Sequence, residues 1–117
     1  MKKVAIIRCL HSNDVCTGAA CLRALANHTG EFSRYGEDKL EIVAFCSCNG
    51  CGKVQFDNDK GIEEKLATIV MLKPDAVHLG VCTQIKNASG KRELCDQIKI
   101  MVKTLTAQGI KIVEGTH

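Results

Sequence analysis

The sequence predicts an α/β fold, a three-layer α/β/α sandwich around a four-stranded parallel sheet of the flavodoxin-like or Rossmann-like kind. Short apolar runs typical of buried strands alternate with segments whose apolar residues recur at helical spacing. Each pair of predicted strands is separated by enough chain for a crossover helix, and right-handed crossovers favour the strand order 2-1-3-4. The chain length of 117 residues fits a single domain, residues 1–117.

The first half of the chain supplies two predicted strands and one helix. Residues 3–7 (KVAII) and 40–45 (LEIVAF) are apolar enough for buried strands. Between them, Thr17 is the expected N-cap of a helix that runs to about His28 and ends before Gly30. Its inner face should carry Leu22, Leu25 and Ala26, and the polar stretch 31–39 should be a surface connection.

The second half repeats the alternation. Asp57, Asn58 and Asp59 offer caps for a second helix, which Pro74 closes, and the next strands are 75–81 (DAVHLGV) and 110–114 (IKIVE). A third helix should begin between Gly90 and Cys95 and end at Gly109. We expect the first helix on one face of the sheet and the other two on the opposite face. The apolar stripes of the second and third helices comprise Ile62, Leu66, Ile69 and Val70, and Leu94, Ile98, Met101, Val102 and Leu105.

Composition excludes some functions and favours others. The net charge is only +3, the basic residues are scattered, and three Phe and one Tyr are the only aromatic residues, which argues against nucleic-acid binding. No stretch is long enough to span a membrane, and Arg8 interrupts the first apolar run before it resembles a signal peptide. We therefore expect a cytoplasmic protein, in which eight cysteines indicate metal or reactive-thiol chemistry rather than disulfides.

The cysteines gather where the predicted strands end. Cys9 follows the first strand, Cys48 and Cys51 follow the second, Cys82 follows the third, and His117 lies just past the fourth. Cys16 lies in the loop before the first helix. Because parallel strands end at one edge of a sheet, where such folds bind ligands, these residues predict a site there.

The spacing of Cys48 and Cys51 suits several chemistries. A C-x-x-C turn, with Gly50 as a permissive residue, aims two sulfurs at one point for zinc, for an iron–sulfur cluster or for dithiol redox chemistry. The convergence of further cysteines and His117 favours a metal. A dinucleotide-binding glycine pattern is absent after the first strand, and Cys16 and Arg23 are out of register for a phosphatase loop.

Other residues have simpler interpretations. Cys46 alternates with the apolar side of its strand and Cys21 lies beside apolar helical residues, so both are expected to be packing side chains. Cys95 could be core or ligand. His78, in the middle of a buried strand, is better explained as a hydrogen-bonded core histidine. Arg8 at the end of a buried strand requires a carboxylate, a backbone carbonyl or an anionic ligand or cofactor near the thiols.

Four motifs together resemble the CGGC-domain family, small prokaryotic proteins described as metal-binding. They are RCxxSxxxCxG at 8–18, CNGC at 48–51, DAVHLGVC at 75–82 and the terminal GTH at 115–117. The resemblance covers nearly the whole chain and implies a metal site without supplying a reaction. Asn49 replaces a glycine of the family motif, and Asp96 and Gln97 follow Cys95 where the family has proline and histidine. The residues that it supports are Arg8, Cys9, Cys16, Cys48, Cys51, His78, Cys82 and His117.

The sequence hypothesis is therefore a metal-binding protein with a Cys/His site at the carboxyl edge of the sheet. Zinc is favoured because a mixed Cys and His set suits tetrahedral zinc, and the excess of cysteines keeps an iron–sulfur cluster as the alternative. The role would be metal storage, sensing or a redox step. The competing hypothesis is a thiol oxidoreductase in which Cys48 or Cys51 is the nucleophile and the other resolves the mixed disulfide. The metal-ligand candidates are Cys9, Cys16, Cys48, Cys51, Cys82, Cys95 and His117.

Overall fold

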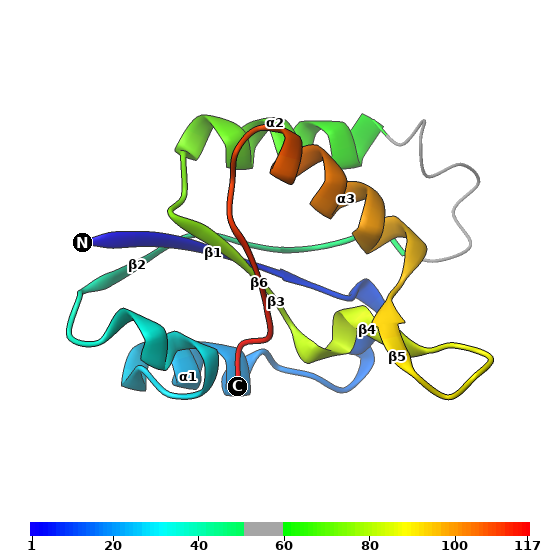
Figure 1. The fold of residues 1–117 in the computed structure, drawn as a ribbon, viewed down its shortest axis with the longest axis horizontal. Helices are drawn as coiled ribbons and strands as arrows, with labels where there is room; N and C mark the ends of the chain where they lie inside the picture. Colours follow the sequence, from blue (N-terminus) through cyan, green and yellow to red (C-terminus); the bar gives the residue numbers. More distant parts are fainter. Residues whose placement is uncertain (51–59) are drawn as a thin grey trace.

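The computed structural model describes residues 1–50 and 60–117, and it contains the predicted parallel sheet. Its strand order is β2-β1-β3-β6, which confirms the predicted order with β6 as the fourth predicted strand (Figure 1). All three strand pairs are parallel. The strands are β1 (Lys2–Arg8), β2 (Leu40–Ser47), β3 (Ala76–Leu79) and β6 (Ile112–Glu114).

Helices cover both faces of this sheet, as predicted. Figure 1 shows α2 (Lys60–Leu72) and α3 (Asp96–Ala107) on one face and α1 (Ala19–Asn27) on the other. The alternation of β1 divides the core: Ala5 and Ile7 pack with α2 and α3, whereas Val4 and Ile6 pack with α1 and Phe32. All four of these β1 residues are fully buried, which explains why the strand reads as one continuous apolar run.

The first helix differs from the prediction at its start and on its inner face. Gly18, at φ 80°, is the N-cap instead of Thr17, whose hydroxyl accepts the Ala19 N–H. The buried stripe consists of Cys21 and Ala24, whereas Leu22 is 43% exposed. The helix ends at Asn27, because His28 adopts a left-handed conformation at φ 54°. The expectation that Leu22 and Ala26 face inward was therefore wrong, whereas Leu25 is partly buried and packs against the cluster that contains Cys21 and Ala24.

The stretch 31–39 is more than a surface connection. It contains most of a 3-10 helix, η2 (Gly30–Tyr35), which places the fully buried Phe32 against the α1 face of the sheet. Phe32 stacks on the imidazole of His78 with the ring centroids 4.2 Å apart. A polar sequence thus contributes one of the largest buried side chains of that layer.

The segment before α3 also differs from the prediction. It forms an antiparallel hairpin of β4 (Gln84–Lys86) and β5 (Arg92–Leu94), which precedes the Cys95 N-cap of α3. Leu94 therefore belongs to a strand and not to the helix. The predicted caps Asp57, Asn58 and Asp59 lie outside the described residues. In the described part of the chain, no helix has the length and apolar character needed to cross a membrane.

His78 is the hydrogen-bonded core histidine that the sequence suggested. Its Nδ1 lies 3.0 Å from the Gly115 carbonyl and its Nε2 lies 2.7 Å from the Tyr35 hydroxyl. A carbonyl can only accept, so Nδ1 carries the proton and Nε2 accepts from Tyr35. Burial lowers the pKa of His78, although the hydrogen bond to Gly115 opposes this effect. The charged groups close enough to influence the ring are Arg34, Glu31 and Lys111.

This histidine should make folding pH-dependent. Because its pKa is lower in the folded state, the unfolded chain binds an extra proton below the ordinary value of about 6.5. The stability present above that pH should be lost as the pH falls. We expect the melting temperature to drop less between pH 7.5 and pH 5 in His78→Gln than in the native protein. His11→Gln, at an exposed position, should retain the native slope. Equal slopes for all three proteins would contradict this assignment.

Candidate functional site

Three cysteines meet at the carboxyl ends of β1, β2 and β3. Cys9 follows β1 directly, Cys48 follows β2, and Cys82 lies in the 3-10 turn η4 (Val81–Thr83) after β3. The sheet register aligns these strand ends, since Arg8 pairs with Ser47 and Ile7 with Leu79. The Cys9 thiol is close enough to the other two for their charges to affect it. All three carry free thiols.

Backbone amides at the end of β1 hold two of these sulfurs. The Cys9 N–H donates to the Cys82 sulfur at 3.3 Å, and the Leu10 N–H donates to the Cys48 sulfur at 3.4 Å. These amides are available because the chain leaves β1 and enters the 3-10 helix η1 (Leu10–Asp14). Donors aimed at sulfur favour the thiolate, which is the form that binds metals and acts as a nucleophile.

Gly80 keeps space open beside Cys82. A Cβ at this position would lie 3.3 Å from the Cys82 sulfur and 3.7 Å from Cγ of Arg8. The Gly80 N–H also donates to the Ile7 carbonyl at 2.9 Å, which fixes the turn against β1. The glycine thus allows the third strand end to approach the first closely.

The three thiols differ in exposure, and the surroundings of Cys9 also affect its acidity. Cys48 is completely buried, whereas Cys9 and Cys82 are partly exposed. Burial raises the pKa of the Cys9 thiol, and the neighbouring Cys48 and Cys82 raise it further against the opposing backbone hydrogen bonds. Cys9 therefore holds its proton more tightly than an ordinary thiol. A bound cation would reverse this preference, because it stabilises the thiolate.

Polar residues that were not among the predicted ligands support the loop after β2. The Gln97 side-chain oxygen accepts the Asn49 N–H at 2.7 Å, and the Lys65 ammonium donates to the Ser47 carbonyl at 2.8 Å and to the Asn49 side-chain oxygen at 2.6 Å. Gln97 is 1% exposed, and its side-chain nitrogen has no partner among the described residues. One feature of the sequence could have identified Gln97 as a residue of this region: it stands two residues after Cys95, where the family that the motifs resemble has histidine.

Arg8 and Cys16 form a second group next to the three thiols. An Arg8 Nη atom donates to the Cys16 carbonyl at 3.3 Å and to the Ser12 hydroxyl at 3.4 Å. Of the three partners that the sequence suggested for Arg8, the structure supplies the backbone carbonyl. The guanidinium also lies 5.2 Å from the centroid of the Phe45 ring, a cation–π contact.

The remaining candidates lie in other surroundings. Cys95 is the N-cap of α3 and packs in the same apolar cluster as Cys48. The backbone of His117 lies beside Gly30, where an added Cβ would come within 2.8 Å of the His117 Cα. Figure 1 places the C-terminus next to α1. Cys51 lies outside the described residues.

The family model of the CGGC domain matches residues 3–117, nearly the whole chain. The chain belongs to the CGGC domain family. Comparison with curated proteins and with solved structures finds no match. In this CGGC domain, the family motif is CNGC at 48–51, and its first cysteine is the buried member of the thiol group.

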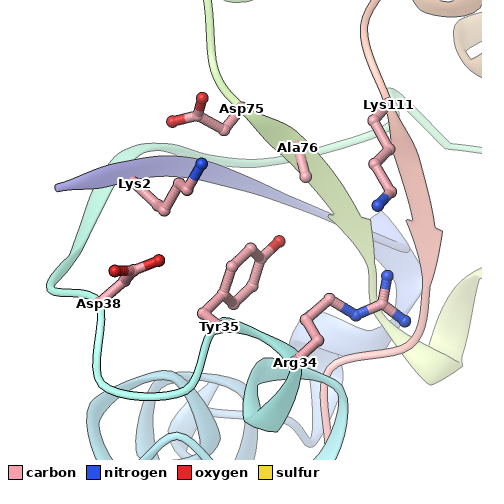
Figure 2. A pocket seen from close by; sticks show the side chains of 7 residues that line it. All are labelled: Lys2, Arg34, Tyr35, Asp38, Asp75, Ala76 and Lys111. Carbon is pink, nitrogen blue, oxygen red and sulfur yellow. The ribbon is translucent and has the colours of Figure 1, made fainter.

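A cavity of about 400 Å³ lies at the opposite edge of this CGGC domain (Figure 2). Lys2, Asp75 and Lys111, near the amino ends of β1, β3 and β6, line it with Tyr35. Figure 2 shows Arg34 and Lys111 extending toward each other on one side of the tyrosine ring. The cavity lies at the amino ends of the strands, whereas Cys9, Cys48 and Cys82 lie at the carboxyl ends. It therefore forms no part of the thiol site.

Proposed function

We propose that this CGGC domain binds a thiophilic metal ion, with zinc as the preferred ion, through Cys9, Cys48, Cys82 and Cys51. The observation that carries the proposal is the meeting of Cys9, Cys48 and Cys82 at three adjacent strand ends, with consecutive amides donating to two of the sulfurs. Amide donors to sulfur and a buried thiol are features that stabilise and shield thiolate ligands. Cys51 is included because its C-x-x-C spacing from Cys48 suits one ion.

Zinc and an iron–sulfur cluster both accept four thiolates. The compactness of the group supports a single ion, since neighbouring amides of residues 9 and 10 hold the sulfurs of Cys82 and Cys48. Among residues 1–50 and 60–117, no three side chains of the ligand types are already arranged to hold an ion. Metal binding on this proposal therefore draws the thiols inward and displaces the proton of Cys9.

The burial of Cys48 also bears on the competing hypothesis that the protein is a thiol oxidoreductase. A nucleophilic thiolate must reach the disulfide of its substrate, but Cys48 is 0% exposed. The residue belongs to the buried apolar cluster that also contains Leu66 and Ile98. Burial thus supports Cys48 as a ligand more than as an attacking group. Thiolate ligands also require a reducing compartment, and we place the protein in the cytoplasm for that reason.

The metal itself is tested by purification without oxygen. We expect a colourless protein with about one zinc per chain, because the closed d shell of zinc gives no visible absorption. Elemental analysis and a visible spectrum of the same sample measure this directly. A brown protein with stoichiometric iron and sulfide would show that the site holds an iron–sulfur cluster instead of zinc. A metal-free protein that also fails to take up added zinc would contradict metal binding altogether.

A further inference from the structure

Cys16 has surroundings unlike those of the three clustered thiols. Its side chain is exposed, and its sulfur accepts the Gly18 N–H at 3.3 Å. Gly18 is the N-cap of α1, so this donor lies at the positive end of a nine-residue helix. The Gly18 N–H lowers the pKa of the Cys16 thiol, and the Arg8 guanidinium adds to the effect by a hydrogen bond and by its charge.

Arg8 provides a second, independent observation. The residue is 7% exposed, and within the described parts of the chain its guanidinium has no carboxylate partner. Its Nε has no hydrogen-bond partner among the described residues, and the oxygens that accept from its Nη are the neutral Ser12 hydroxyl and Cys16 carbonyl. A buried cation without a counter-charge is costly. The Cys16 thiolate would supply that charge at the same place.

The packing around Arg8 holds it next to Cys16. Phe45 lies against the guanidinium, and Gly18 leaves room for both side chains. A Cβ at Gly18 would lie 3.0 Å from Phe45 and 3.7 Å from an Arg8 Nη atom, at a φ of 80° that already disfavours a side chain. The local fold therefore builds a fixed cation beside an accessible sulfur.

We propose that Cys16 is a peroxide-sensitive thiol, oxidised to a sulfenic acid by hydroperoxides and separate from the metal-binding group. The thiolate attacks the terminal oxygen of the hydroperoxide, the one that carries hydrogen, so an S–O bond forms as the O–O bond breaks. Sulfur loses two electrons and the peroxide gains them. The leaving hydroxide or alkoxide is neutralised by the proton that the thiol released to solvent when the thiolate formed, which gives water or an alcohol. A second thiol can then condense with the sulfenic acid to a disulfide and release water.

Selectivity follows from the contrast with the other cysteines. Burial raises the pKa values of Cys9 and Cys46, and Cys48 is fully buried. Thiolate character and exposure together determine which cysteine oxidises first. Among the described cysteines, Cys16 is the one that combines an exposed side chain with these two positive neighbours.

The first test is pulsed alkylation of the metal-free protein with iodoacetamide over a range of pH, read at each cysteine by peptide mass spectrometry. We expect Cys16 to react at least about fivefold faster at pH 7 than Cys9 or Cys46, with its rate profile midpoint below that of an ordinary thiol. Arg8→Gln should slow Cys16 and move the midpoint upward, and Arg8→Lys should restore most of the rate. Circular dichroism checks that the variants fold, and the ranking within the native protein needs no variant.

The second test uses hydrogen peroxide and the zinc-loaded protein. At less than one equivalent of peroxide, a sulfenic-acid trap such as dimedone should mark Cys16 first. Zinc should protect Cys9 and Cys82 from alkylation but leave Cys16 reactive. The proposal is overturned if another described cysteine is trapped first, or if Cys16 reacts no faster than Cys9. It is also overturned if zinc protects Cys16, which would then be a ligand. Failure of zinc to bind contradicts the metal proposal alone and leaves the alkylation ranking intact.

Discussion

Replacing Cys48 with serine should weaken zinc binding at least about a hundredfold. A serine hydroxyl stays protonated at neutral pH and is a poor zinc ligand, while its oxygen can still accept the Leu10 N–H that now reaches the Cys48 sulfur. Loss of an outer hydrogen-bond partner alone weakens metal affinity about 10–100-fold, so loss of a ligand should cost at least about a hundredfold. Competition with a chromogenic zinc chelator measures the change.

Cys46→Ser is the matched control for this substitution. Cys46 lies two residues earlier, is half-buried and packs against the same core cluster. Its replacement introduces the same polar oxygen close to the same place, without removing a proposed ligand. We expect Cys46→Ser to keep its zinc. Equal zinc affinity in both variants would place the metal elsewhere and leave Cys48 to packing.

Zinc should also stabilise the fold strongly. A ligand that binds only the folded state at about a thousand times its dissociation constant adds about 4 kcal/mol of stability. For a chain of 117 residues, this corresponds to a rise of roughly 10 °C or more in melting temperature. Scanning calorimetry of metal-free protein with and without zinc measures the rise. Magnesium, which prefers oxygen ligands, should have no such effect.

The stabilisation by zinc should weaken as the pH falls. Coordination requires the Cys9 thiolate, and burial raises the pKa of this thiol, so it carries its proton at both pH 6 and pH 8. Displacing that proton costs more free energy at pH 6, where protons are more abundant. The rise in melting temperature should therefore be smaller at pH 6. It should be largely absent at either pH in Cys48→Ser. A pH-independent rise that survives in Cys48→Ser would mean that the ion binds at groups other than these thiols.

The sheet could be predicted from the sequence because its central strands are buried on both faces. Val4 to Ile7 form one apolar run, which is typical of a covered parallel strand, and right-handed crossovers then favour the strand order that the structure has. The hairpin β4–β5 could not be predicted, since its strands have three residues each. Phe32 was missed because its burial depends on stacking with His78, a residue distant in sequence.

The gathering of three cysteines at the strand ends could be predicted from the sequence, but the position of the chain end could not. Cys9, Cys48 and Cys82 come together because the strands that precede them are neighbours in the sheet. His117 follows a short strand, and Gly115, at φ 106°, changes the path of the chain. The next residue, Thr116, then contacts Cys21 through its hydroxyl and accepts the Glu31 N–H. These contacts hold the chain end beside α1, and no local pattern in the sequence predicts them.

X-ray absorption at the zinc edge tests the central claim most directly, because it counts the atoms bound to the metal. We predict four sulfurs at about 2.3 Å in the native protein. The shell should be unchanged in Cys16→Ser and in His117→Ala, and it should fall to three sulfurs in Cys9→Ser. A shell dominated by nitrogen and oxygen would contradict the account. So would a nitrogen contribution that disappears in His117→Ala, or a shell of four sulfurs that persists in Cys9→Ser.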